Sequence, residues 1–161
     1  MTDGFSPIER PDALLLILGT GPSRVSLEKG EYYGHPSNAF WPIMQELFKV
    51  KTESYQEKKQ LLLDHRIALW DTLKCFDRVG SLDSGYKQVE PNRLEEFIKE
   101  HKSLKAVLFT GKKAEEFYRK HIGYYPKGID FIALPSPSSA NTMPYGEKFS
   151  LYHDAILSRL R

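Results

Sequence analysis

The segment ALLLILG at residues 13–19 joins six apolar residues to a closing glycine. Its length and its boundary predict a strand that is buried on both faces of a parallel sheet. Later segments of similar character end in the same way, one at Thr110 and Gly111 and another at Pro135. The predicted strands therefore span residues 13–18, 67–73, 106–109 and 129–134.

Segments with helical spacing alternate with these strands. The predicted helices span residues 38–50, 55–63, 91–101, 112–121 and 149–160. Strands and helices in alternation are typical of a parallel sheet with helices on both faces. The sequence predicts an α/β fold: a three-layer α/β/α arrangement around a central, mostly parallel four-stranded sheet, in a single domain over residues 1–161.

Composition narrows the class of protein. The chain has 161 residues, 40% of them hydrophobic, and a formal net charge of +2, which permits nucleic-acid binding without requiring it. Its one cysteine, Cys75, excludes a disulfide framework, a zinc ribbon and a four-cysteine iron–sulfur cluster. No secretory signal is visible in residues 1–13, and no apolar run approaches the ~20 residues of a membrane span. We therefore expect a cytoplasmic monomer that does not associate with a membrane.

The loop after the first strand has an unusual composition. Residues 19–41 read GTGPSRVSLEKGEYYGHPSNAFW, and their pattern is neither helical nor strand-like up to the helix that begins near residue 38. Surface loops rarely hold four aromatic side chains, and ligands of such sheets bind outside the carboxyl ends of the strands. The loop therefore predicts a pocket for a flat, polar, ring-shaped ligand.

Two familiar nucleotide-binding motifs do not fit this loop. A dinucleotide fingerprint would need glycine where Arg24 stands, although Gly19 and Gly21 match its first two positions. No segment supplies a complete phosphate-binding loop, since residues 110–113 hold only a fragment of one.

Two separated motifs together resemble a known family. GTGPSRVS at 19–26 with GEYYGHPSNAFW at 30–41, followed by LPSPSSAN at 134–141, is similar to the uracil-DNA glycosylase superfamily, and most similar to its hypoxanthine-DNA (deoxyinosine) glycosylase branch. Shorter pieces at 69–71, 80–84 and 109–111 also fit. The resemblance implies that a deaminated base in DNA is flipped out and removed by hydrolysis of its N-glycosidic bond, with no metal and no cofactor.

The resemblance also implies where the chemistry lies. The superfamily usually carries Asp or Asn at the position of Gly21, so this chain lacks that water-activating residue. In the hypoxanthine branch the catalytic role passes to the residue that is Asn38 here, which would orient a water through its carbonyl oxygen. Asn38 is equally suited to cap a helix that begins at Ala39, and one residue can serve both roles.

A second group of residues is implied to bind the base. Tyr33 would stack on the base, and main-chain groups of Gly19, Thr20 and Gly21 would read its edge. His35 is either structural or a contact to the base or its neighbouring phosphate. Phe40 is either a base contact or part of the core, as its helical spacing suggests.

The second motif is implied to hold the DNA backbone through serine hydroxyls and main-chain N–H groups. Its first position is Leu134 where the best-known members carry a histidine that donates to uracil, so hypoxanthine is favoured over uracil. Uracil or a G:T/U mismatch remains an alternative substrate, and a non-catalytic nucleic-acid-binding protein an alternative function. Ser138 stands where an apolar wedge is usual, so either wedging is weak or a neighbour such as Met143 or Tyr145 takes that place. The implied DNA-binding residues are Pro135, Ser136, Pro137, Ser138, Ser139, Asn141 and Lys148.

Overall fold

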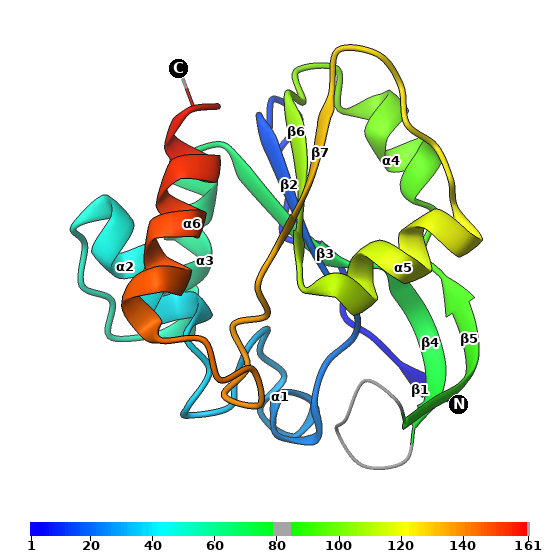
Figure 1. Ribbon diagram of the computed structural model, residues 1–161, viewed down its shortest axis with the longest axis horizontal. Helices are drawn as coiled ribbons and strands as arrows, with labels where there is room; N and C mark the ends of the chain where they lie inside the picture. The colour runs from blue at the N-terminus through cyan, green and yellow to red at the C-terminus, as the bar shows by residue number, and fades with distance from the viewer. Residues whose placement is uncertain (79–84, 161) are drawn as a thin grey trace.

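The computed structural model describes residues 1–78 and 85–160. Its central sheet has four parallel strands in the order β3-β2-β6-β7 (Figure 1). These are β2 (Leu15–Gly19), β3 (Ile67–Asp71), β6 (Ala106–Thr110) and β7 (Asp130–Leu134). All four predicted strands are present, and the predicted parallel sheet is confirmed.

Helices cover both faces of this sheet, as predicted. Successive side chains of β2 point to opposite faces of the sheet. Leu15 and Ile17 belong to one buried cluster, whereas Leu16 and Leu18 belong to another. The first cluster packs against α2 (Phe40–Phe48), α3 (Tyr55–Asp64) and α6 (Tyr145–Leu157), and the second against α4 (Leu94–Glu100) and α5 (Lys112–His121). The three-layer architecture is visible in Figure 1, with α2, α3 and α6 on one side of the sheet and α4 and α5 on the other.

The register of the sheet brings the strand ends together. Gly19 of β2 pairs with Asp71 of β3, and Thr110 of β6 pairs with Leu134 of β7. The segments that leave these strands therefore begin at the same edge of the sheet. In Figure 1 the loops after β2 and β7 meet there, at the lower end of the sheet.

A second sheet was not predicted. It is antiparallel, in the order β1-β4-β5, with β1 (Thr2–Asp3), β4 (Leu73–Arg78) and β5 (Tyr86–Pro91). The predicted strand 67–73 breaks at Thr72, whose backbone N–H and hydroxyl both donate to the Gly19 carbonyl, at 2.8 and 3.0 Å. The chain turns there from the parallel sheet into the antiparallel one.

Helix boundaries also differ from the predictions. The expected loop 19–36 contains α1 (Arg24–Lys29), which the Ser23 hydroxyl caps at one end and Gly30, with φ of 68°, ends at the other. The last helix begins at Tyr145 and not at residue 149, because the Pro144 carbonyl accepts from the backbone N–H groups of Glu147 and Lys148 and Gly146 does not interrupt the helix. Across the described residues, no helix is long and apolar enough to cross a membrane. The GSLDS piece at 80–84, with Asp83, lies outside the described residues.

Candidate active site

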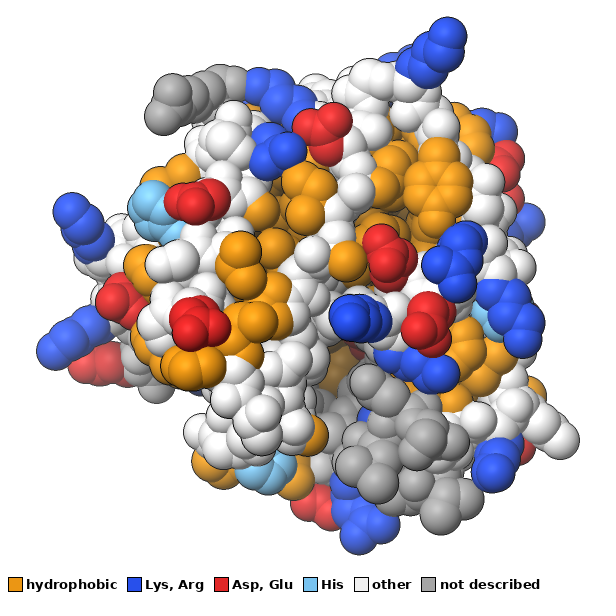
Figure 2. Space-filling model, in the orientation of Figure 1, with side chains coloured by type: hydrophobic (Ala, Val, Ile, Leu, Met, Phe, Trp, Pro, Cys, Tyr) orange, Lys and Arg blue, Asp and Glu red, His pale blue; other side chains and the backbone are white. Residues whose placement is uncertain are grey.

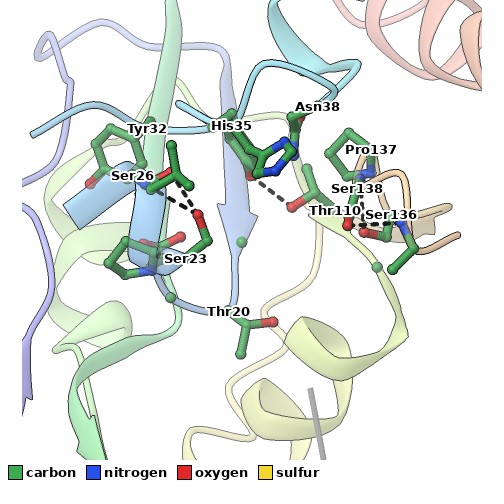
Figure 3. A pocket seen from close by; sticks show the side chains of 18 of the residues that line it. Thr20, Ser23, Ser26, Tyr32, His35, Asn38, Thr110, Ser136, Pro137 and Ser138 are labelled. Carbon is green, nitrogen blue, oxygen red and sulfur yellow. Dashed lines mark hydrogen bonds between the residues drawn. The ribbon is translucent and has the colours of Figure 1, made fainter. Parts of the chain in front are cut away.

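A pocket of about 420 Å³ lies at the carboxyl edge of the parallel sheet. It is bordered by the segment after β2, by the ends of β3 and β6, and by the loop after β7 (Figure 3). The volume is in the range of roughly 300–1,000 Å³ that is usual for small-molecule sites. The sequence predicted a pocket at the loop after the first strand, and residues of both motifs line this one cavity.

Tyr33 forms part of the pocket wall. Its hydroxyl lies 2.7 Å from Thr110 Oγ1, and its backbone φ of 53° turns the chain sharply there. Phe40 stacks on one face of its ring, with centroids 4.1 Å apart and an interplanar angle of 19°. Only the opposite face of Tyr33 is therefore left for a ligand. Phe40 itself is fully buried and does not line the pocket, so its place is behind the pocket wall and not against a base.

Asn38 also lines the pocket and is half-buried. Its Oδ1 accepts a hydrogen bond from the Phe40 backbone N–H at 2.9 Å. The helix begins at Phe40, two residues after the start of the predicted helix 38–50, and the Asn38 side chain supplies the bond that the cap residue Ala39 does not. Within residues 1–78 and 85–160 the Asn38 amide nitrogen has no protein partner. The Asn38 side chain therefore caps the helix through Oδ1, while its amide nitrogen remains without a partner among the described residues.

Hydrogen bonds join the two motifs around Asn38. The Ala39 backbone N–H donates to the Pro137 carbonyl at 2.9 Å, and Ser37 Oγ donates to Ser139 Oγ at 2.9 Å. Ser37 also contacts His35, since its backbone N–H donates to His35 Nδ1 at 3.1 Å. Figure 3 shows Asn38 between His35 and Pro137. The exposed imidazole of His35 lies at the mouth of the pocket.

The loop after β7 contributes four of its predicted residues to the pocket. They are consecutive and polar apart from one proline: Ser136, Pro137, Ser138 and Ser139. Pro135 and Asn141 do not line the pocket. The Pro135 carbonyl accepts from the Tyr152 hydroxyl at 2.6 Å, and Asn141 Oδ1 accepts from the Met143 backbone N–H at 2.9 Å. These two residues shape the loop that carries the four serine and proline contacts.

Lys148 does not lie where a phosphate contact was expected. Its side chain is only 4% exposed, and its amine donates to the carbonyls of Ser138 at 3.1 Å and Asn141 at 2.9 Å. Burial lowers the pKa of this amine. Lys148 therefore ties the loop to α6 from within and does not present its charge to solvent.

Both glycines of the first motif stand in crowded places. A Cβ on Gly19 would lie 2.6 Å from Asp71 Oδ1 and 2.8 Å from the Tyr33 hydroxyl. A Cβ on Gly21 would lie 2.8 Å from Phe76 Cε1 and 3.2 Å from the Tyr86 hydroxyl. The space that an Asp or Asn side chain would need at position 21 is thus filled by aromatic rings from β4 and β5.

The main chain of the first motif is partly occupied. The Gly19 carbonyl accepts from Thr72, and the Thr20 carbonyl accepts from the Leu73 backbone N–H at 3.1 Å. Thr20 and Gly21 both line the pocket. The carbonyls of Gly19 and Thr20 already accept hydrogen bonds within the protein. The main-chain contacts that were expected to read a base would therefore come from other backbone groups of this segment.

Asp71 is among the pocket residues to which the sequence assigned no role. It lines the pocket, is 4% exposed, and its Oδ2 has no hydrogen-bond partner among the described residues. Burial raises the pKa of its carboxyl to about 7, although the nearby Arg78 lowers it. The available signal was its place at the carboxyl end of a buried strand, where the ligands of parallel sheets bind.

In the part of the chain that the structure describes, no three His, Cys, Asp or Glu side chains come together in a way that could hold a metal ion. The face of the molecule in Figure 2 shows positive and negative side chains interspersed, with no broad field of one sign. A polyanion would therefore be held at particular groups around the pocket.

Replacing Gly21 with Asp tests the crowding at that position. The new side chain must displace Phe76, so Gly21→Asp should lower the free energy of unfolding by about 1–3 kcal/mol. Gly146→Asp is the matched control, because a Cβ there meets nothing within 4 Å. Urea unfolding measures both variants. Equal stability of Gly21→Asp and Gly146→Asp would show that the rings of β4 and β5 yield freely.

Replacing Asp71 with Asn tests the unpaired carboxyl. The folded-state pKa of about 7 lies above the ordinary value of 3.8, so the folded protein binds the proton more tightly than the unfolded chain. Stability contributed by this group is complete below about pH 4 and is lost as the pH rises to about 7. Asp71→Asn should therefore raise the free energy of unfolding by about 1–3 kcal/mol at pH 8 and by less at pH 5.

Thermal unfolding at the two pH values checks this expectation. Asp154→Asn is the control, since its carboxyl is exposed and a change there should alter stability little at either pH. A gain from Asp71→Asn that is equal at pH 5 and pH 8, or a loss at both, would contradict a raised pKa.

Comparisons with known proteins identify the family of this chain. A model of the uracil DNA glycosylase superfamily matches residues 7–161. Two similar proteins, each named "Hypoxanthine DNA glycosylase", come from Methanosarcina barkeri, at 36% identity, and Methanosarcina acetivorans, at 34% identity. Each match spans 142 residues, which is 86% of this chain and 87% of the relative.

A solved structure is similar as well. It is the solution NMR structure of a protein described as a candidate uracil DNA glycosylase from Methanosarcina acetivorans. The TM-score is 0.82 at 29% identity, over 99% of this chain and 98% of that one. The family match covers both motifs and the sheet between them, which supports a DNA glycosylase activity. The chain belongs to the uracil DNA glycosylase superfamily.

Proposed function

We propose that this protein removes hypoxanthine from DNA by hydrolysing the N-glycosidic bond of deoxyinosine. The observation that carries the proposal is the joining of the two motifs in one pocket, which Asn38, Tyr33 and residues 136–139 all line and where the Ala39 backbone N–H donates to the Pro137 carbonyl. The two relatives named hypoxanthine DNA glycosylase support the choice of base.

The pocket offers a place for a base taken out of the DNA stack. An enzyme that acts on the glycosidic bond has to extrude the nucleotide, and the free face of Tyr33 can stack on the extruded ring. Stacking of this kind contributes roughly 1–3 kcal/mol and accepts any base. Tyr33 therefore contributes affinity, and recognition of the base comes from polar groups.

Asn38 is the group proposed to position the water. A neutral amide is a weak base, so its contribution is to hold the water near C1′ while the sugar gains positive charge and the base negative charge. The amide nitrogen, which has no protein partner in the described part of the chain, and the second lone pair of Oδ1 are available for this purpose. The hydrogen bond to the Phe40 N–H fixes the side chain, which favours positioning.

The loop at 136–139 is proposed to hold the DNA backbone beside the pocket. Serine hydroxyls and main-chain N–H groups bind phosphate oxygens without reading sequence. The anchors from Lys148 and Tyr152 limit the motion of this loop. The backbone of the flipped nucleotide would thus be held at a fixed distance from Asn38.

The first position of the second motif bears on the choice between hypoxanthine and uracil. Leu134 is 5% exposed and has no side-chain donor, so it cannot hydrogen-bond a departing uracil as a histidine would. This observation supports hypoxanthine as the preferred base, and uracil is the alternative that the assay addresses.

Release of the base is the direct test. Labelled duplexes that carry hypoxanthine, uracil or xanthine are incubated with excess protein, and abasic sites are then cleaved with alkali. We expect cleavage at hypoxanthine to be fastest. No cleavage of any duplex would overturn the enzymatic function, and cleavage at uracil without cleavage at hypoxanthine would overturn the substrate.

Replacing Asn38 separates catalysis from capping. Asn38→Ala should lower the single-turnover rate by roughly 10²-fold or more, the scale of losing one oriented polar group. It should also lower the free energy of unfolding by about 1 kcal/mol, because the cap is lost.

Asn38→Ser is the matched control, since a serine hydroxyl can accept from the Phe40 N–H but lacks the amide. We expect Asn38→Ser to recover the stability that Asn38→Ala loses, with the rate still low. Recovery of both stability and rate in Asn38→Ser would show that Asn38 serves only as a cap.

A further inference from the structure

The mechanism above leaves the carboxyl of Asp71 without a role. Asp71 ends β3 and pairs in register with Gly19, at the carboxyl edge where the pocket lies. It is almost fully buried, and its Oδ2 has no partner among the described residues. A buried polar atom without a partner destabilises a folded protein, so its presence in a pocket points to a functional role.

The surroundings of Gly19 form a polar site. Asp71 Oδ1, the Tyr33 hydroxyl and Thr110 Oγ1 lie within 2.6, 2.8 and 3.4 Å of the point where a Cβ on Gly19 would be. Tyr33 and Thr110 are already paired with each other at 2.7 Å. The carboxyl of Asp71 is therefore the group of this site that is left to interact with a ligand.

A departing base requires a hydrogen-bond donor. When the N-glycosidic bond of deoxyinosine breaks, the electron pair stays on the base, and the negative charge spreads to its carbonyl oxygen. A donor placed at that oxygen stabilises the transition state. The side chain of Leu134 supplies none, so another group of the pocket has to act there.

We propose that Asp71, as a neutral carboxylic acid, donates a hydrogen bond to the carbonyl oxygen of the departing base and stabilises its negative charge. This inference rests on the proposed function. The carbonyl oxygen is what deamination adds to adenine at this edge of the ring, so the same contact distinguishes hypoxanthine from purines that lack it.

The protonation state agrees with this role. Burial raises the pKa of the Asp71 carboxyl to about 7, so a large fraction holds its proton near neutral pH. Arg78 on β4 acts in the opposite direction and lowers this pKa. The other titratable groups that face Asp71 or line the same pocket are Tyr32, Tyr33, His35, Tyr55, Tyr86 and Lys113.

The step balances without a further reactant. The bond between C1′ of the sugar and N9 of the base breaks, and its electron pair leaves with the base. The oxygen of the water held by Asn38 forms the new bond to C1′, and one proton of that water ends on the base. Asp71 keeps its proton throughout, so it acts as a hydrogen-bond donor and is regenerated without a separate step.

Paired substrates test the contact directly. Single-turnover rates are measured on duplexes with deoxyinosine and with deoxynebularine, whose purine base lacks the carbonyl oxygen. We expect Asp71→Ala to lower the deoxyinosine rate by roughly 10²-fold and the deoxynebularine rate by less than about threefold. Equal losses on both substrates would assign Asp71 a structural role and overturn the inference.

The pH profile gives a second readout that a structural role would not change. The wild-type rate on deoxyinosine should fall above about pH 7, by about tenfold per pH unit, as the carboxyl loses its proton. Asp71→Asn keeps a donor that does not titrate, so it should retain most of the rate and show no such fall. A wild-type profile that is flat from pH 6 to pH 9, or a fall that persists in Asp71→Asn, would overturn the inference.

Binding separates failure of the inference from failure of the proposed function. Affinity is measured for duplexes with 2′-fluoroarabino analogues of deoxyinosine and deoxynebularine, which resist cleavage. If the wild-type protein releases no base, the proposed function fails. The contact is then supported only if the wild type prefers the inosine analogue and Asp71→Ala does not. Loss of the rate preference in Asp71→Ala, with wild-type release of hypoxanthine intact, supports both proposals.

Discussion

The absence of a side chain at Gly19 is the constraint on which the site depends. Asp71, Tyr33 and Thr110 reach it from three different segments, and even one carbon atom there would collide with two of their oxygens. This close approach requires β2, β3 and β6 to end in register, which the buried apolar side chains on both faces of the sheet enforce. The core of the domain and the polar floor of the pocket are therefore parts of one arrangement.

Crowding also explains why residue 21 carries no side chain. The antiparallel sheet brings Phe76 and Tyr86 into the place that a catalytic side chain would occupy. Their rings meet edge to face with centroids 5.1 Å apart, and Arg78 lies over the Tyr86 ring at 4.3 Å. The rings of Phe76 and Tyr86 thus fill the space that an Asp or Asn side chain at this position would need. Asn38, on the other side of the pocket, is where the proposed chemistry lies.

The parallel sheet and its loops could be predicted because they depend on local patterns. Apolar runs such as residues 14–18 identify buried strands, and the motif sequences identify the pocket walls. The helix α1 was not predicted, although Ser23 and Gly30 mark its ends, because its six residues are too few to show a helical apolar period.

Other features depend on contacts between distant segments, and no pattern in the sequence shows them. The break at Thr72 results from hydrogen bonds to Gly19, and the burial of Lys148 results from the path of a loop that it anchors. Asp71 illustrates the same limit. Its position at the end of a strand is visible in the sequence, whereas the lack of a partner for Oδ2 among the described residues follows only from the packing around it.

The anchoring of the loop at 136–139 has a consequence for the nucleic acid. Lys148 and Tyr152 hold this loop from α6, and Ala39 holds it from the start of α2. If the proposed function holds, a loop fixed at three points cannot follow the contour of a regular duplex, so the duplex has to distort to meet it. The energy of that distortion is smallest where a base pair is already weak. The protein would then select DNA sites by how easily their base pairs open, before any group in the pocket contacts the base.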